Sequence, residues 1–325
     1  MIPRRHLLAL LGPALVGPWL PGRALAQDIP RKTITLVVGF AAGGAADGAA
    51  RVIAKKLGEQ LGVTVVVDNR GGAGGNIAHL AVARAEPDGS TILLGSVGPL
   101  SIAQHMVKLG YDPQHDLAPL TMGVMFPNVL VVPTSLGVKS LAEFIALARK
   151  SPGKVTYAST GNGSASHLAG ELLAQMAGVD MLHVPYKGGA PALTDVLAGR
   201  VDSYFSTLSS AQPHIEAGKL VALASSGLQR PSFLPRLPTV AESGYPGFNA
   251  TNWYAFVAPG RTPAPLLARW NQELVRALNA PEVRDDLLRH GMLAQPGSRE
   301  DLARTIEAES QQWGKLIRER KIAAD

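Results

Sequence analysis

Hydrophobic segments alternate with amphipathic ones along the first third of the chain. The largely apolar run Ile34–Phe40 fits a strand buried on both faces, and residues 46–61 carry alanine, isoleucine and leucine at helical spacing. Val63–Val67 is a second predicted strand, a short helix is expected near Ile77–Arg84, and Thr91–Gly95 is a third strand. This order of strands and helices predicts a parallel sheet with right-handed crossovers.

A second unit of the same kind follows further along the chain. Residues 141–148 form a predicted helix with one apolar face, and other segments with helical spacing separate the strands. The predicted strands of this unit are Val129–Val132, Val155–Ser159, Met181–Pro185, Val201–Phe205 and Leu220–Ala224.

The last part of the chain is predominantly helical. A strand over Trp253–Ala258 is followed by a helix in which Thr262 suits the N-cap and Pro263 the first helical position. Ser298 with Asp301 resembles a pair that opens the final helix. Because no strands are predicted among these helices, we expect them to pack back onto the first sheet.

The pattern predicts an α/β fold with two lobes, each a mostly parallel sheet flanked by helices. The chain leaves the first unit near Val124 and returns near Thr251. We therefore predict that residues 27–124 plus 251–325 form the first lobe and residues 125–250 the second lobe. Two crossings make a hinge, and small molecules bind in the cleft between such lobes.

The N-terminal 26 residues have the composition of a signal peptide. Arg4 and Arg5 precede the apolar run Leu7–Leu20, and an A-x-A pattern ends at Ala26. We predict cleavage near Ala26 and a periplasmic location, with an uncleaved anchor as the alternative. The arginine pair leaves both the twin-arginine route and general secretion open.

Charge and composition narrow the class of protein. The net charge is +6, and removal of Arg4, Arg5 and Arg23 leaves 6 − 3 = +3. No basic block with interleaved aromatic residues remains, so we expect no nucleic-acid partner. The absence of cysteine excludes disulfides, thiolate metal sites and attachment through a lipid-modified cysteine. We expect a monomer that is free in the periplasm.

Two glycine-rich loops lie where sheets of this type bind ligands, at the carboxyl ends of strands. Residues 41–47 follow the first predicted strand, residues 160–167 follow Val155–Ser159, and a helix begins directly after each loop. The first N–H groups of a helix lack partners and attract anions, so two such starts in different lobes can grip one acid group. The alternative is that both loops are only tight strand-to-helix turns.

Five other side chains have both a functional and a structural interpretation. Asp47 either favours the helix dipole or pairs with a ligand ammonium group, and Lys187 either reaches the cleft or stays in a solvated loop. His167 either contacts ligand or bonds to nearby backbone. Asn128 and Ser96 either orient a ligand or belong to turns.

Motifs for catalysis are incomplete. Residues 72–77 lack one glycine of the dinucleotide fingerprint, and residues 161–164 do not form a nucleophile elbow. There is no phosphate-binding loop and no histidine spacing that fits a metal site. We predict a protein that is not an enzyme and has no cofactor, no catalytic residues and no metal.

Many blocks of the sequence resemble the Bug-type receptors of tripartite tricarboxylate transporters. They include ITLVVGFAAGGAAD, VVVDNRGGAGGNIA, PDGSTILLGSVGPL, YASTGNGSASHLAGELL, HVPYKGGAPALTDVLAGRVD and NWYAFVAPGRTP, in the family's order. The resemblance implies a two-lobed Venus-flytrap fold of the type II-like periplasmic binding proteins. It also implies a solute receptor that binds a small carboxylate, whether dicarboxylate, amino acid or aromatic acid, and delivers it to the transporter's membrane subunits.

The resemblance also implies a set of ligand contacts. Those of the first lobe are Phe40, Ala41, Ala42, Gly43, Gly44, Ala45 and Ser96, and those of the second are Asn128, Thr160, Gly161, Asn162, Gly163, Ser164, His167, Tyr186, Lys187, Gly188 and Ser206. Family members often carry proline where Gly39, Ala41 and Gly71 stand here, so the first loop is expected to be looser. A ligand-binding input for a sensor system remains the alternative function.

Overall fold

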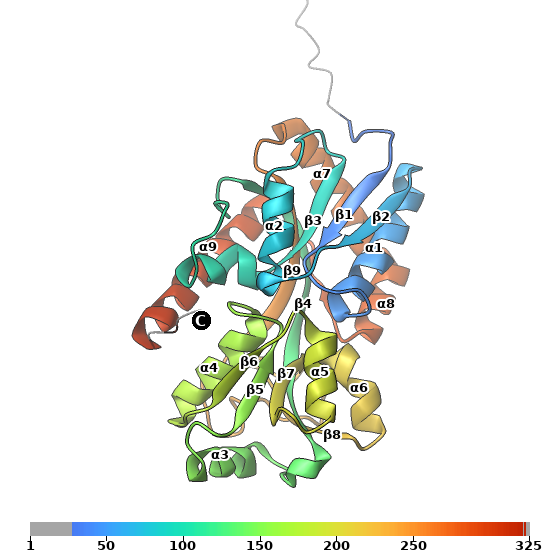
Figure 1. Cartoon of the computed structure of the whole chain (residues 1–325). Helices are drawn as coiled ribbons and strands as arrows, with labels where there is room; N and C mark the ends of the chain where they lie inside the picture. The colour runs from blue at the N-terminus through green and yellow to red at the C-terminus, as the bar shows by residue number, and fades with distance from the viewer. Residues whose placement is uncertain (1–27, 321, 323–325) are drawn as a thin grey trace, which may run out of the picture.

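The computed structural model describes residues 28–320 and residue 322, so the predicted signal peptide lies outside the described residues. Two lobes lie one above the other in Figure 1, and the first lobe, at the top, combines the two ends of the described chain. Its strands are β1 (Ile34–Val38), β2 (Val65–Asn69), β3 (Thr91–Ser96), β9 (Thr251–Pro259) and β10 (Leu293–Ala294). Its helices are α1 (Ala45–Leu61), α2 (Asn76–Ala83), α7 (Ala264–Leu278), α8 (Pro281–Arg289) and α9 (Arg299–Arg320). Three short helical turns complete the lobe: η1 (Ala73–Gly75), η2 (Gly98–Ile102) and η3 (Ala103–His105).

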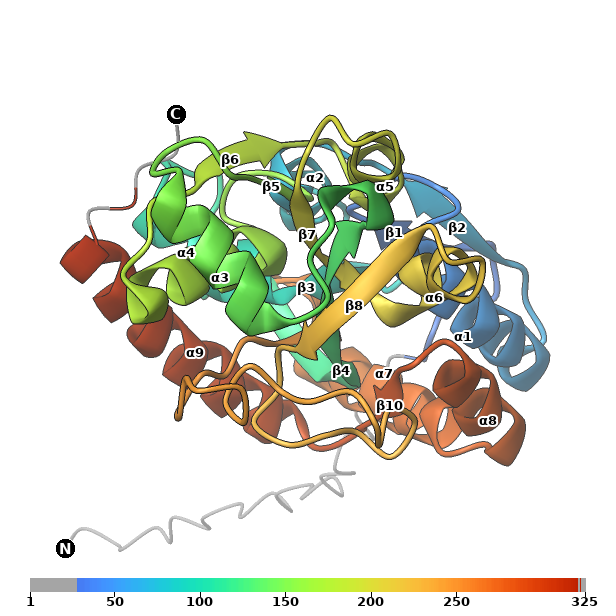
Figure 2. The same cartoon turned by 90° about the horizontal axis from the view of Figure 1, so that it is seen from below.

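The second lobe is formed by the middle of the chain. Its strands are β5 (Thr156–Ser159), β6 (Leu182–Pro185), β7 (Ser203–Thr207) and β8 (Leu220–Ser225), and its helices are α3 (Leu141–Lys150), α4 (Ala165–Ala177), α5 (Gly189–Leu197) and α6 (Leu208–Glu216), with one short turn η4 (Thr134–Leu136). Figure 2 shows this lobe from below, with α3 and α4 on one side of the sheet and α5 and α6 on the other.

One long strand, β4 (Leu117–Pro133), connects the lobes. Its first part pairs with β9 and β10, and its last part pairs with β7 and β8. The partner changes between Pro127, opposite Thr251, and Asn128, opposite Thr207. The limits of the lobes at 124/125 and 250/251 remain a prediction, and this change of partner lies three residues beyond the first of them.

The sheet has a parallel part in each lobe and an antiparallel part between them. The strand order is β2-β1-β3-β9-β4-β7-β5-β6. β1 runs parallel to β2 and β3, and β5 runs parallel to β6 and β7. Between these parallel parts, β3 is antiparallel to β9, β9 is antiparallel to β4, and β4 is antiparallel to β7. The α/β class is therefore confirmed, and the carboxyl ends of β1 and β5 lie near the junction of the lobes (Figure 1).

Helices cover both faces of the sheet and bury its apolar side chains. In the first lobe, α1, α7 and α8 pack on one face and α2 and α9 on the other. Helix α3 illustrates the local physics, because Ser140 accepts the N–H of Glu143 as its N-cap and the apolar stripe of the helix is buried. The stripe consists of Leu141, Phe144, Ile145 and Ala148.

Two local predictions at the C-terminal end are wrong. Helix α7 begins at Ala264 with Pro263 as its N-cap, because ψ of Pro263 is extended at 139°, and the hydroxyl of Thr262 is buried without a partner among the described residues. Strand β10 pairs with β4, although no strand was expected between these helices. The Ser298–Asp301 pair is confirmed, since the N–H of Asp301 donates to the Ser298 hydroxyl at 3.0 Å.

Candidate functional site: a cavity between the lobes

A narrow cavity of about 40 Å³ lies between the two lobes and opens to solvent. Its wall takes residues from the loop after β1, from the ends of β3, β5 and β7, and from the two strands that cross between the lobes, β4 and β9. Eight of the predicted contacts are in this wall. They are Phe40, Ala41, Gly44, Ala45, Ser96, Asn128, Thr160 and Ser164.

Four helices begin at or next to this wall. The N-caps of α1, α5 and α6 are Gly44, Gly188 and Thr207, and no capping side chain accepts a backbone N–H of these three helices. Helix α4 is different, because the hydroxyl of Ser164 accepts the N–H of His167. The unpaired backbone N–H groups at these helix starts carry the positive end of the helix dipole. Because such starts lie in both lobes, they would attract an anion in the cavity from two sides.

The wall contains no charged side chain among the residues that the structure describes. Its polar groups are hydroxyls, side-chain amides and the backbone N–H groups of the helix starts. An anion in this cavity would therefore be held by dipoles and hydrogen bonds instead of by a cationic side chain.

Two side chains, Asn69 and Asp47, hold the loop after β1. The Nδ2 of Asn69 donates to the carbonyl of Phe40 at 3.1 Å. Asp47 in the first turn of α1 accepts the N–H of Gly43 and the Nε of Arg51, each at 3.0 Å. Burial raises the pKa of Asp47, but the hydrogen bonds from Arg51 and Gly43 outweigh it and leave that pKa below its usual value. Asp47 is therefore an anionic brace for the loop, and its side chain is not part of the cavity wall.

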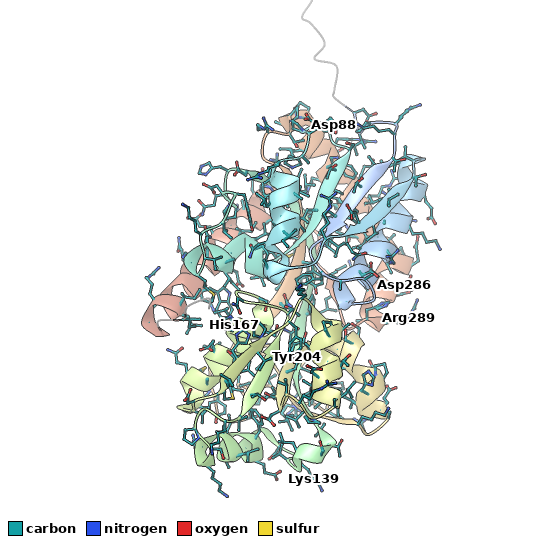
Figure 3. The ribbon with its side chains drawn as sticks, in the orientation of Figure 1. Asp88, Lys139, His167, Tyr204, Asp286 and Arg289 are labelled. Atoms are coloured by element: carbon teal, nitrogen blue, oxygen red, sulfur yellow. The ribbon has the colours of Figure 1, made fainter. Side chains whose placement is uncertain are left out.

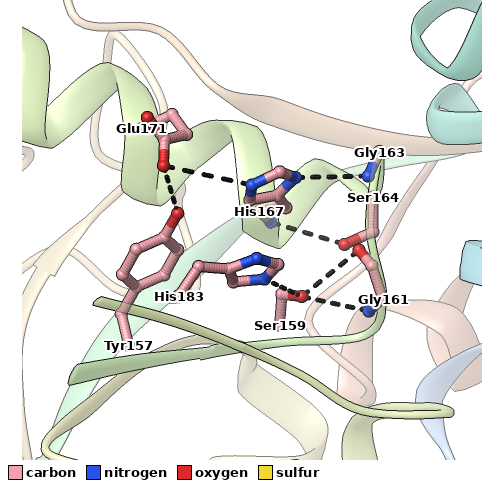
Figure 4. A network of polar contacts seen from close by, with 8 residues as sticks. All are labelled: Tyr157, Ser159, Gly161, Gly163, Ser164, His167, Glu171 and His183. Atoms are coloured by element: carbon pink, nitrogen blue, oxygen red, sulfur yellow. Dashed lines mark hydrogen bonds and ion pairs between the residues drawn. The ribbon is translucent and has the colours of Figure 1, made fainter. Parts of the chain in front are cut away.

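The loop after β5 is held by a denser network, which Figure 4 shows. The N–H of Gly161 donates to the Ser159 hydroxyl at 3.0 Å, and that hydroxyl lies 2.6 Å from Nε2 of His183. The N–H of Gly163 donates to Nδ1 of His167 at 3.2 Å. The rings of His167 and His183 stack with centroids 3.9 Å apart.

This network depends on a neutral His167. Burial, together with the charge of His183, lowers the pKa of His167 to about 3. A neutral ring can accept the N–H of Gly163 at Nδ1 and point Nε2 toward Glu171, whose Oε1 is 4.0 Å away. His167 therefore bonds to the backbone of the loop after β5 and lies outside the cavity wall. This is the structural one of the two interpretations of this side chain.

Ten predicted contacts are not in the cavity wall. Gly43, Gly163 and Gly188 adjoin wall residues in sequence, and the hydroxyl of Ser206 donates to the carbonyl of Thr207. Four others line a separate groove on the surface, where the lobes meet. The ten are Ala42, Gly43, His167, Gly163, Gly188 and Ser206, and, in the groove, Gly161, Asn162, Tyr186 and Lys187.

The lobes touch through glycine backbone beside that groove. Gly161 has φ of +127°, and a Cβ placed on it would lie 2.8 Å from the backbone nitrogen of Gly74 in the other lobe. A Cβ on Gly98 would lie 2.8 Å from the carbonyl oxygen of Gly163. Only glycine permits this close approach, so these residues serve the contact between the lobes.

Sequence reasoning missed several wall residues. Gly189 had a signal, because it follows another glycine at the start of a helix, as in the first loop. The tyrosines and Asn252 lie within strands, where the sequence does not say which face or which sheet will border the cleft. The missed polar or helix-start residues are Ala46, Ala165, Ser166, Gly189, Ala190, Tyr204, Thr207, Ser210, Asn252 and Tyr254.

The described residues give little support for a metal site, a serine–histidine catalytic site or a membrane-spanning helix. No group of three histidine, aspartate or glutamate side chains in residues 28–320 is arranged to hold a metal ion. Ser159 and His183 form a hydroxyl–imidazole pair, but Ser159 is fully buried and cannot meet a substrate. No helix within the described part of the chain is both long and apolar enough for a membrane span.

Residues 49–322 match the family described as "Tripartite tricarboxylate transporter family receptor". The protein BugT of Bordetella pertussis is 34% identical over 316 residues, which cover 97% of each chain. Two solved structures are similar over nearly their whole length. R. palustris Rpa4515 with adipate has a TM-score of 0.87 and 38% identity, covering 91% of this chain and 99% of that one. MatC from Rhodopseudomonas palustris with bound malate has a TM-score of 0.84 and 32% identity, covering 89% of this chain and 99% of that one.

Proposed function

This chain belongs to the tripartite tricarboxylate transporter family of receptors, and from this premise we propose that it binds a small organic acid in the cavity between its lobes. The members of this family are solute-binding receptors and not enzymes. The ligand's carboxylate would lie against the uncapped starts of α1 and α5, beside the capped start of α4. The receptor would then deliver the acid to the transporter's membrane subunits.

The observation that carries the proposal is the convergence of uncapped helix starts on one wall without charged side chains. A charge-assisted hydrogen bond contributes roughly 1.5–3 kcal/mol, and a helix terminus adds roughly 0.3–1 kcal/mol. Four or five such contacts, less the costs of association and closure, leave about 8 kcal/mol, which corresponds to a micromolar dissociation constant. No ligand-binding arginine is needed.

The similar proteins support the same ligand chemistry. Rpa4515 was solved with adipate and MatC with malate, and both ligands are organic acids. The eight predicted residues in the wall, among them Phe40, Ala45 and Thr160, are the first candidates for direct contacts in this chain.

A thermal-shift and calorimetry panel tests the proposal. The purified protein is titrated with C3–C8 mono- and dicarboxylates, with the amides of the same acids and with neutral sugars as controls. A bound acid at 100 times its dissociation constant should add about 2.7 kcal/mol of stability, whereas the amides should add little. A rise in melting temperature with sugars or amides, and none with any acid, would show that the carboxylate proposal is wrong.

Location and delivery are part of the same proposal. We infer that the N-terminal segment is a signal peptide cleaved near Ala26 and that the mature receptor is a periplasmic monomer. N-terminal sequencing of the protein from a periplasmic extract and light scattering of the pure protein test these points. Uptake of the bound acid by cells that carry the membrane subunits should require this receptor, and uptake that persists without it would contradict delivery.

A further inference from the structure

The surface groove where the lobes meet, called the junction groove below, has a volume of about 310 Å³ and takes residues from both lobes. It is separate from the cavity, since no residue lines both. The first lobe contributes Ala73, Gly74, Asn76 and Val107, and the second contributes Gly161, Asn162, Pro185, Tyr186 and Lys187.

The junction groove is complete only while the lobes touch. A Cβ on Gly161 would lie 2.8 Å from the backbone nitrogen of Gly74, and a Cβ on Gly71 would lie 3.6 Å from the carbonyl oxygen of Lys187. Each of these contacts joins one lobe to the other. When the lobes move apart, the two sides of the groove separate, so its shape distinguishes a closed receptor from an open one.

Apolar side chains are exposed in and beside the junction groove. Val107 lines it and is 37% exposed, and Ile77 of α2, which follows the groove residue Asn76, is 51% exposed. Pro185 and Tyr186 add apolar surface from the second lobe. Exposed apolar surface bordered by polar residues is typical of a protein–protein interaction site.

Three cationic side chains surround this apolar surface. Lys187 lines the groove, Lys108 follows Val107, and Nη2 of Arg84 lies 3.9 Å from where a Cβ of Gly110 would be. All three are exposed, and none forms a side-chain hydrogen bond or ion pair within the part of the chain that the structure describes.

The carboxylates nearby do not balance this charge. No acidic side chain among the described residues lines the junction groove. Asp112, in the adjoining groove that also contains Val107, accepts the N–H of Gln114 at 2.8 Å and lies 2.9 Å from Nδ1 of His115. The surface therefore has uncompensated positive charge around an apolar centre, which complements a partner with acidic side chains around an apolar one.

We propose that the junction groove docks an acidic segment of the transporter's membrane subunits, with an apolar side chain against Val107 and carboxylates near Lys187 and Lys108. This inference rests on the proposed function and deepens it, because it assigns the surface by which the loaded receptor is recognised. Only a closed receptor presents both sides of the groove together, so the partner selects the receptor that has bound its acid.

Two other partners fit the junction groove less well. A loop or a helix end can enter a concave groove of this size, whereas a flat layer of anionic lipid headgroups can meet only its edges. A second copy of this chain would bring the same positive charges against Lys187 and Lys108, and like charges in contact oppose association.

Docking is measured by biolayer interferometry on the purified membrane subunits in phosphatidylcholine nanodiscs, with and without a saturating acid from the panel. The acid should strengthen docking of wild type by about tenfold or more, because it favours the closed state. Val107→Asp should weaken docking by about 30-fold, and Lys187→Glu and Lys108→Glu by about tenfold each. Added salt should weaken docking of wild type more than that of Lys187→Glu.

Lys139→Glu and Leu288→Asp are the matched controls. Lys139 is an exposed lysine at the far end of the second lobe (Figure 3). Leu288 is 42% exposed on α8, between Asp286 and Arg289, which Figure 3 shows on the side of the first lobe away from α2. Both controls should dock as wild type does. Because no altered residue lies in the cavity wall, acid affinity measured by calorimetry should change less than about threefold in all five variants.

The outcomes separate this inference from the proposed function. A wild-type receptor that binds no acid contradicts the proposed function. A receptor that binds acid overturns the docking surface alone if the groove variants dock as wild type does, if the controls lose as much as they do, or if docking is equal with and without acid. Loss of docking confined to the groove variants, with acid affinity kept, supports the docking surface.

Two further measurements test the other partners. Wild type that binds phosphatidylglycerol vesicles as tightly as it binds the membrane subunits, with the binding lost in Lys187→Glu, would assign the groove to a lipid surface and overturn the proposal. Sedimentation that shows a dimer of wild type but a monomer of Val107→Asp would assign it to a second copy of the chain, with the same consequence.

Discussion

The loops that follow β1 and β5 are both rich in glycine and both lead into helices, yet they are fixed by different means. After β1, the backbone is held by the carboxylate of Asp47 and the amide of Asn69, and the start of α1 has no capping side chain. After β5, Ser164 caps α4 and the Ser159–His183–His167 network fixes the backbone from behind (Figure 4). The helix start after the second loop is thus capped by the protein itself, whereas the helix start after the first loop has no side-chain cap.

This difference suggests a division of roles in binding. A preorganised loop loses little entropy when a ligand arrives, so it can receive the acid first. Under the proposed function, the uncapped start of α1 would gain its missing partners when the lobes close over the ligand. The most informative experiments alter one loop and leave the other intact.

The largest effect is expected from giving α1 a cap of its own. In Gly44→Asp, the new carboxylate would accept the free amides of α1 and repel the ligand, since Gly44 has φ of −85° and room for a side chain. Binding should weaken by about 100-fold, or about 2.8 kcal/mol, while the melting temperature stays equal or rises. Calorimetry with the best acid of the panel measures this.

Ala280→Asp provides the control, because Ala280 is the uncapped N-cap of α8 and lies outside the cavity wall. It should stabilise its helix and leave binding unchanged. If Gly44→Asp binds the acid as tightly as wild type, the start of α1 is not part of the binding site.

A smaller effect is expected from Gly161→Ala, which alters the contact between the lobes. The added Cβ would lie 2.8 Å from the backbone nitrogen of Gly74, so the lobes could not approach as closely as they do here. Binding should weaken by about 20-fold, near 1.8 kcal/mol. Small-angle scattering with saturating ligand should show a larger radius of gyration than wild type.

Gly178→Ala separates backbone strain from this clash. Gly178 also has a positive φ, +62°, but a Cβ there meets nothing within 4 Å. The Gly178→Ala variant should be less stable than wild type but should bind the ligand with the same affinity. Equal binding losses in both variants would indicate that strain, and not contact between the lobes, explains the result.

The network behind the second loop should also make the stability of the fold, as distinct from ligand binding, depend on pH. The pKa of His167 falls from 6.5 in the unfolded chain to about 3 in the folded one, so the unfolded chain takes up the proton first as pH falls. Stability should therefore be lost as pH drops from about 6.5 toward about 3, by up to about 1.4 kcal/mol per pH unit. Chemical denaturation of wild type and His167→Asn at several pH values measures the slope.

The slope of stability against pH should be shallower in His167→Asn, because the variant lacks the titration of His167. It should not vanish, because His79 and His105 also have lowered pKa values and still contribute in the variant. The contribution of Asp47, in the first loop, has a different pH dependence. Its carboxylate loses the stabilising charge only below its ordinary pKa of 3.8. Identical slopes for wild type and variant between pH 6.5 and 5 would contradict this account of the second loop.

The parts of the fold that depend on local pattern were predictable. The strands ending at Val38 and Ser159 and the helices after them follow from apolar runs, glycine-rich turns and helical spacing. The same signals located Gly44 and Ser164 in the wall of the cavity. Thr262 shows the limit, because a good N-cap residue was excluded from its helix by the extended backbone of Pro263.

The sequence by itself determined the two α/β units, the family and the helix starts that face the cleft, because each is specified by residues close together in the chain. Only the tertiary structure placed Tyr204 and Tyr254 in one wall and turned His167 away from it. Whether a side chain in a strand or a first turn borders a cleft or a core depends on which elements pack on each face. That is decided by contacts between segments far apart in the sequence, which no local pattern encodes.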